Sequence, residues 1–164
     1  MTRQPVAGFD VEGPVQAEVF VLSLVGDRPI LTGPCGAAPW YVEVGADEDP
    51  MAVVAATVRR VIGEPLVVHS TSWRRDRAAV VLSFVAVISP SLVATMAAAP
   101  LGRAELARGD AAAAPEMISV GQVVEHGLRH LAWLIEDDPV VAQRLAGDWP
   151  AVLSGYAPEP FRHL

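Results

Sequence analysis

The sequence predicts an α/β (α+β) fold, with a mixed β-sheet, a helix packed on that sheet and a helical C-terminal segment. Apolar runs of strand length occur in hairpin-like pairs on both sides of an amphipathic run at residues 50–62. From residue 119 onward, apolar residues recur at helical spacing instead. We therefore expect an extended arm over residues 1–15, which lack periodicity, and one domain over residues 16–164.

The first strands are predicted from short apolar runs separated by turn residues. Residues 16–25 have the composition of a buried strand, Gly26-Asp27 forms a turn, and residues 29–32 return as a second strand of a hairpin. Gly33 begins a loop that leads to a further strand at Trp40. These elements supply the first half of the predicted sheet.

The helix over residues 50–62 has start and stop signals as well as periodicity. Asp49 suits the N-cap, and Pro50 suits the first helical position, where its missing N–H is not needed. Gly63 suits the residue just past the end. One face carries an apolar stripe that we expect to pack on the sheet: Met51, Val54, Val58, Val61 and Ile62.

Two longer apolar runs follow the helix and predict a second hairpin. The strands are expected at residues 66–73 and 78–89, joined by the turn Arg74-Arg75-Asp76-Arg77. Three arginines in one turn can bind an anion, but a solvated turn is the simpler expectation. A short helix at residues 91–98 and a loop at 101–115 complete this part of the prediction, with a short strand at 117–120 as the alternative for the end of this segment.

The C-terminal part is predicted to be helical over residues 119–155. Ser119 and Gln122 have the spacing of a capping box at the start of the longest helix. Its apolar face comprises Val120, Val124, Leu128, Leu131 and Ile135. Two shorter helices are expected after Asp138-Pro139 and Asp148-Trp149-Pro150. Aromatic residues concentrate here, and with the high apolar content they predict a homodimer that uses this segment or an exposed strand edge.

Bulk properties restrict the class of protein. The chain has 164 residues, of which 52% are hydrophobic, yet no apolar run reaches the roughly 18 residues of a membrane helix. No apolar signal-peptide core follows Met1, and Cys35 is the only cysteine, so we expect a cytoplasmic protein without an intramolecular disulfide. A net charge of −7 argues against a nucleic-acid partner, which needs a basic face. Acidic clusters at residues 47–49 and 136–138 precede predicted helices, where carboxylates favour the helix dipole.

The segment from Trp40 to Gly63 resembles the signature motif of the Nudix family. That motif runs glycine, five residues, glutamate, seven residues, then Arg-Glu-apolar-any-Glu-Glu-any-Gly. The spacing from Glu48 to Gly63 fits without a gap, and a tryptophan is common shortly before the motif. The resemblance covers roughly residues 16–90 and implies a Nudix-like mixed sheet with the helix packed on one face.

The chemical residues of that motif are missing, so the resemblance is to a degenerate Nudix box. Val42 stands where the first glycine would be, and Ala56 replaces the arginine. Thr57, Arg60 and Val61 replace the three helix glutamates that bind Mg²⁺ in the family. Magnesium needs several oxygen ligands, which one remaining carboxylate does not supply.

The degenerate motif implies a non-catalytic Nudix-fold protein that acts as a small-ligand-binding or protein-interaction module. The alternative is a divergent Nudix-type hydrolase, acting on a nucleoside diphosphate derivative with Mg²⁺ through other carboxylates such as Glu43 and Glu48. In the non-catalytic case we expect no cofactor. Arg60 would then favour the phosphate or carboxylate of a small anionic ligand.

A candidate pocket is predicted from the polar residues near the box and in the following strand. Residues 69–73 form the most polar stretch in an otherwise apolar strand, which is typical of a pocket lining or of a solvent-facing edge. His69 and Ser70 point to opposite strand faces, so they do not form a nucleophile–base pair. The candidate ligand-binding residues are Glu43, Glu48, Arg60, His69 and Trp73.

Two further histidines lie on the longest predicted helix. His126 and His130 are four residues apart and share one face. Two imidazoles at this spacing are candidate metal ligands, but a third ligand such as His69 would have to come from elsewhere. Hydrogen bonding on the helix surface or between helices is the simpler expectation, and no metal site is predicted.

Overall fold

A computed structural model describes residues 14–104, 106 and 118–158, so most of the predicted N-terminal arm lies outside the described part. The fold is mixed α and β, as the sequence predicts. The strands are β1 (Val15–Val25), β2 (Arg28–Thr32), β3 (Trp40–Val44), β4 (Val67–Asp76), β5 (Ala79–Val87) and β6 (Ala98–Pro100). The helices are α1 (Pro50–Val61), the 3-10 helix η1 (Pro90–Thr95), α2 (Val120–Asp137), α3 (Pro139–Arg144) and α4 (Trp149–Leu153). None of the described helices is long and apolar enough to span a bilayer.

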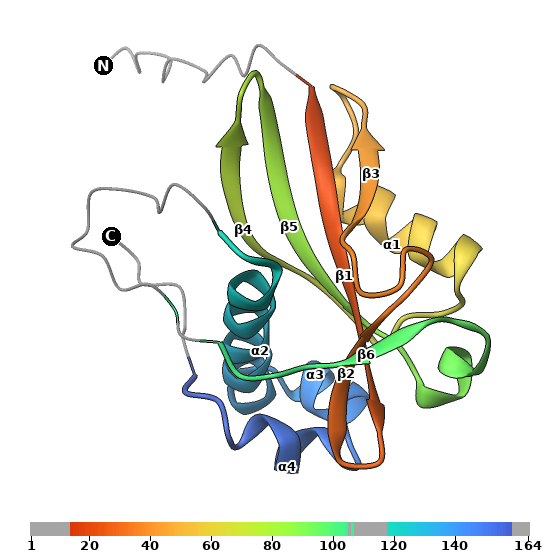
Figure 1. The fold of residues 1–164 in the computed structure, drawn as a ribbon, viewed down its shortest axis with the longest axis vertical. Helices are drawn as coiled ribbons and strands as arrows, with labels where there is room; N and C mark the ends of the chain where they lie inside the picture. Colours follow the sequence, from red (N-terminus) through yellow and green to blue (C-terminus); the bar gives the residue numbers. More distant parts are fainter. Residues whose placement is uncertain (1–13, 105, 107–117, 159–164) are drawn as a thin grey trace, which may run out of the picture.

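Strand β1 is the centre of one mixed sheet with the order β4-β5-β1-β2-β6 (Figure 1). It pairs in parallel with β5 along one edge. Its other edge is divided, because residues 15–19 pair with β3 and residues 21–25 pair with β2, both antiparallel. This topology leaves β4 at one end of the sheet.

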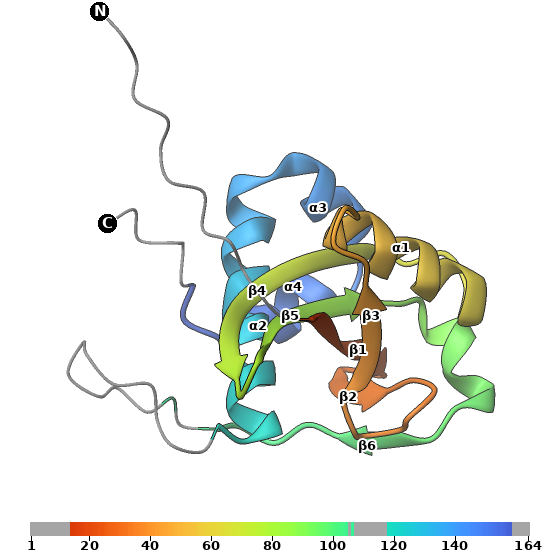
Figure 2. The same cartoon turned by 90° about the horizontal axis from the view of Figure 1, so that it is seen from above.

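The helices cover opposite faces of the sheet (Figure 2). Helix α1 packs on the face that carries Val19 and Phe84. Helices α2 and α4 pack on the other face, which carries Phe20 and Val85. Because strand side chains alternate between faces, neighbouring residues of β1 serve two separate hydrophobic cores.

Helix α1 begins as predicted, and its apolar stripe is confirmed except at the end. The carboxylate of Asp49 accepts a hydrogen bond from the Met51 N–H at 3.0 Å, and Val54 and Val58 are fully buried. Val61, however, is 51% exposed, so its expected place in the core is wrong. Ile62 just past the helix packs against the core at this end, as does Leu92 from η1. The Leu92 side chain lies against Gly63, whose φ of +138° favours glycine.

The second hairpin differs from the prediction in where it turns. Strand β4 continues through Asp76, so Arg74 is a strand residue, and the turn falls at Arg77, whose φ is +54°. A register shift between Ser70 and Ser72 marks a β-bulge. Such a bulge changes which face the following side chains occupy.

The segment after β5 is only partly as predicted. The expected helix at 91–98 is the 3-10 helix η1, followed by β6, which pairs with β2. The alternative of a strand at 117–120 does not hold for its described residues, because Ile118 and Ser119 are not in a strand and Val120 begins α2. Residues 101–104 and 106 have no regular structure, and the rest of the predicted loop lies outside the described residues.

Helix α2 has the predicted capping box, in which the Gln122 side chain accepts from the Ser119 N–H and the Ser119 hydroxyl accepts from the Gln122 N–H. It lies very close to the sheet at Gly127, where an added Cβ would be 2.6 Å from Cγ1 of Val85. Both short C-terminal helices are confirmed. Trp149 and Tyr156 are buried in the core, so these two aromatics are packing residues rather than an exposed interface.

Candidate functional site

The main candidate site is a cavity of about 270 Å³ between β4 and the first turns of α2. Its walls combine apolar and polar side chains. The apolar contribution comes from Trp73, Leu106, Ile118 and Val123, and the polar contribution from Ser72, Arg74, Gln122 and His126. Cavities with mostly apolar walls and a few polar groups are typical of small-molecule sites.

A buried carboxylate lies behind this cavity. Glu18 of β1 is 2% exposed and is held by Arg74 through both guanidinium NH groups, with NH2–Oε2 at 2.7 Å. The hydroxyl of Ser83 donates to the same carboxylate at 2.6 Å. Hydrogen bonding to Glu18 raises the pKa of Arg74, so this guanidinium stays charged. The arginine expected in a solvated turn is therefore part of a charge-neutral, half-buried pair.

Three histidines lie in a row beside the cavity. Nε2 of His69, on β4, is 3.3 Å from Nδ1 of His130, on α2, within hydrogen-bonding distance. The ring of His126 packs edge-on against that of His130, with centroids 4.4 Å apart. His130 is 2% exposed, and burial lowers the pKa of His69. Two imidazoles hydrogen-bond only while at least one ring nitrogen at the contact is unprotonated.

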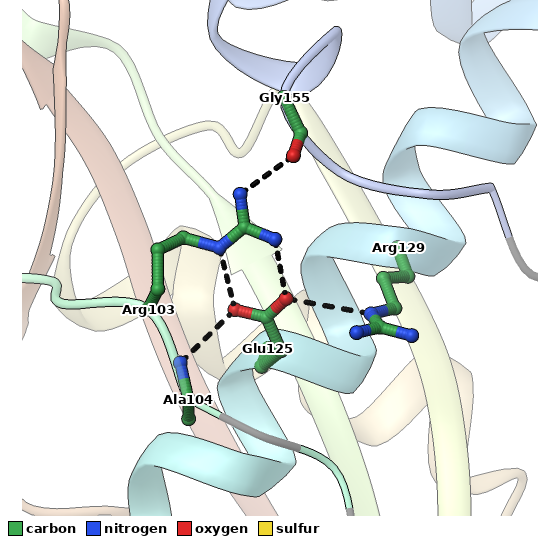
Figure 3. A network of polar contacts seen from close by, with 5 residues as sticks. All are labelled: Arg103, Ala104, Glu125, Arg129 and Gly155. Carbon is green, nitrogen blue, oxygen red and sulfur yellow. Dashed lines mark hydrogen bonds and ion pairs between the residues drawn. The ribbon is translucent and has the colours of Figure 1, made fainter.

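A second polar network holds the chain segment near the cavity against α2 (Figure 3). The buried carboxylate of Glu125 accepts from Nε and NH2 of Arg103 at 3.1 and 2.9 Å, and from the Ala104 N–H. Arg129 lies one turn further along α2, with its Nε 3.4 Å from the same carboxylate. Arg103 also donates to the Gly155 carbonyl. Charge-assisted, bidentate contacts of this kind fix geometry, so residues 103–104 are held in place.

The five predicted pocket residues do not form one pocket. Glu48 and Arg60 line an open depression on the α1 side together with Val53, Ala56 and Thr57. Glu43 is exposed on β3 between Val42 and Val44, whose side chains face the α1 core, so alternation places Glu43 on the opposite face.

His69 and Trp73 lie at the other site. His69 contacts α2 beside the cavity, and Trp73 lies at the cavity rim with 69% of its surface exposed. The β-bulge places Trp73 opposite Leu82, which packs on the α1 side, and so separates it from the face of His69. The predicted set is thus divided between two faces of the sheet.

The histidines considered as metal ligands lie next to one another. His126 and His130 are adjacent, and His69 is the third histidine that the sequence suggested. Among the described residues, however, no group of three or more His, Cys, Asp or Glu is arranged to hold a metal ion. On the α1 side, Glu48 accepts a hydrogen bond from the Gly45 N–H at 2.8 Å within its own loop.

Sequence reasoning did not name Glu18 or Gln122 as residues of the site, and it included Ser72 only within the polar stretch 69–73 and Arg74 only within a turn. One signal was available, since Glu18 is the single charged residue in the apolar run from Val15 to Val25. A charge in such a position is buried with a partner or faces solvent, and the sequence does not distinguish these cases. Arg74, its partner, is 56 residues away.

Comparisons with known proteins do not assign this chain to a class. No protein-family model matches it, and no characterised protein matches it.

Proposed function

We propose that this chain is a non-catalytic protein with a Nudix-like fold that binds a small molecule in the cavity between β4 and α2. The observation that carries the proposal is the combination of apolar walls and a few polar lining groups in this cavity. The Glu125 network supports it, because it holds the neighbouring chain segment against α2. A site of fixed shape binds with less loss of conformational entropy.

The side chains of the α1 depression support binding without hydrolysis. Helix α1 has Thr57, Arg60 and Val61 at the positions where the Nudix family, which this segment resembles, has Mg²⁺-binding glutamates. Arg60 makes no ion pair with another described residue, but it is exposed. A single exposed guanidinium holds an anion weakly in water. We therefore place the ligand in the β4–α2 cavity rather than at Arg60.

Catalysis is tested by a phosphate-release screen over nucleotide sugars, dinucleotides and nucleoside triphosphates with Mg²⁺ or Mn²⁺. We expect no enzymatic turnover, because Glu48 stands without the other box carboxylates and bonds its own loop. Turnover that disappears in Glu48→Gln would overturn the non-catalytic proposal and favour the divergent hydrolase.

Binding is tested by a fragment screen on the ¹⁵N-labelled chain. We expect fragments to shift the amide signals of Ser72 and Val123, and we expect Val123→Trp to abolish these shifts by filling the cavity. Val140→Trp is the matched control, because Val140 is exposed on α3 away from the cavity. Shifts that persist in Val123→Trp would place binding elsewhere.

We also propose that the protein is a cytoplasmic homodimer. The exposed, unpaired Cys35 agrees with a reducing compartment. Among the described residues, strand β4 ends the sheet and pairs along one edge only, and it carries the exposed Trp73. Light scattering on the wild type and on Trp73→Arg tests this assembly: a dimer that becomes a monomer in the variant is expected. A wild-type monomer at high micromolar concentration would contradict it.

A further inference from the structure

We propose that the β4–α2 cavity selects a compact, uncharged molecule with an apolar body and a neutral hydrogen-bonding group, and that it discriminates against anions and cations. This inference rests on the proposed function and names the ligand class of the same site. It replaces the anionic ligand that Arg60 suggested.

The charge balance at the cavity is the first reason. Among the described lining residues, Arg74 is the only arginine and His126 the only histidine, and there is no aspartate or glutamate. Its guanidinium is already paired with Glu18, which is almost completely buried. An anion would have to compete with a carboxylate that is fixed in place and bound through two nitrogens. An anionic ligand therefore finds no uncompensated positive charge on Arg74.

A cationic ligand would need a free carboxylate, and Glu18 is already engaged. Glu18 is the carboxylate paired with the lining residue Arg74, but Arg74 engages both of its oxygens and Ser83 donates to one of them. Displacing Arg74 would leave its charge without its partner in a half-buried place, which is costly. The Glu18–Arg74 pair therefore offers no uncompensated charge to an anionic or a cationic ligand.

The remaining surface fits a neutral molecule. Val123, Ile118 and Leu106 supply hydrocarbon, so an apolar body gains from leaving water. The Ser72 hydroxyl makes no hydrogen bond with another described residue, and a hydroxyl both donates and accepts. An amide or hydroxyl group on the ligand can satisfy it without introducing a charge.

Three probes with one ring and different charges test the inference: benzamide, benzoate and benzamidine. Each is titrated into the ¹⁵N-labelled full chain at neutral pH, and the shifts of Ser72 and Val123 are followed. We expect benzamide to bind about tenfold or more tightly than either charged probe, since a buried charge without a partner is disfavoured. Ser72→Ala should weaken benzamide binding several-fold, because the amide loses its partner.

Two variants are expected to shift the selectivity toward opposite charges. Glu18→Gln leaves Arg74 without its carboxylate, and we expect benzoate to gain on benzamide. Arg74→Gln leaves Glu18 without its guanidinium, and we expect benzamidine to gain instead. Both substitutions keep hydrogen-bonding groups at the position, and far-UV circular dichroism establishes whether each variant folds. The wild-type ranking decides the proposal even where neither variant folds.

The outcomes separate this inference from the proposed function. Tighter binding of benzoate or benzamidine to the wild type would overturn the neutral-ligand inference and leave the cavity as a binding site. Equal binding of all three probes would also overturn it. An absence of shifts at Ser72 and Val123 with all three probes would overturn both proposals.

Discussion

The two faces of the sheet are built from different kinds of residue. On the α1 face, Val54 and Val58 close a core of aliphatic side chains and Phe84. On the α2 face, the hydrophobic core is accompanied by buried ionisable groups, namely Glu18, Glu125 and His130. Tyr156 is also buried on this side. Within the described part of the chain, no other residue with an ionisable side chain is buried.

This difference indicates that the α1 face mainly stabilises the fold, whereas the α2 face is suited to selecting a ligand. Aliphatic burial is non-directional and stabilises the fold without selecting a ligand. Buried charges are costly unless they are paired, so their partners are fixed in position. The α2 face, with the pairs Glu18–Arg74 and Glu125–Arg103, is therefore the side on which a specific site is expected.

The largest effect is expected on the α1 face from Val58→Asp. This places an unpaired carboxylate in an aliphatic core, and we expect a loss of more than about 4 kcal/mol of unfolding free energy, or no folded protein. Val61→Asp is the matched control three residues further along, because Val61 is exposed and should lose less than about 1 kcal/mol. Urea unfolding measures both. Equal losses would show that the helix packs differently.

A smaller effect is expected on the α2 face from Gly127→Ala. The new methyl group would be 2.6 Å from Cγ1 of Val85, so we expect a loss of about 1–3 kcal/mol despite the better helix propensity of alanine. Gly121→Ala on the same helix meets only ordinary contacts, the nearest at 3.5 Å, and should be neutral or slightly stabilising.

The clash itself is isolated by a double-mutant cycle that combines Gly127→Ala with Val85→Ala. Val85→Ala alone leaves a cavity. It also removes Cγ1 of Val85, which is the atom that the new methyl group of Gly127→Ala would clash with. The double variant should therefore be more stable than the sum of the single changes predicts. Strict additivity would contradict the close approach of α2 to β5.

The smallest effect is expected on the pH dependence of the unfolding free energy, to which His69 on the α2 face contributes. Burial lowers the pKa of His69 below its usual value of 6.5, so the unfolded chain binds that proton more readily than the folded chain. This contribution to stability is fully present above pH 6.5 and is lost as the pH falls from there through the lowered folded-state pKa. Urea unfolding from about pH 5 to 8 should show stability falling with acid more steeply in the wild type than in His69→Gln. Equal slopes would show that His69 is not the source.

Local physical chemistry determined most of the secondary structure from the sequence alone. The N-cap at Asp49, the capping box at Ser119 and the turn at Gly26 depend on residues a few positions apart, and all three are confirmed. Hairpin pairing and the two amphipathic helices follow from short-range periodicity in the same way. The mixed sheet with α1 and α2 packed on it was therefore predictable.

Only the tertiary structure decided which side chains share a site. Glu18 and Arg74 are 56 residues apart, and His69 and His130 are 61 apart, so no local pattern joins them. The bulge between Ser70 and Ser72 changed the alternation of β4. It brought Arg74 to the face of His69, and simple alternation would have placed these residues on opposite faces.

The same reason explains the two main errors of the sequence prediction. Arg60 and His69 were expected in one pocket, but α1 and α2 cover opposite faces of the sheet, so the two residues cannot meet. Val61 continued the apolar stripe, but burial depends on what another element supplies opposite a side chain, and Ile62 and Leu92 pack there instead. Periodicity specifies a face of one element, and only packing specifies which of its residues are covered.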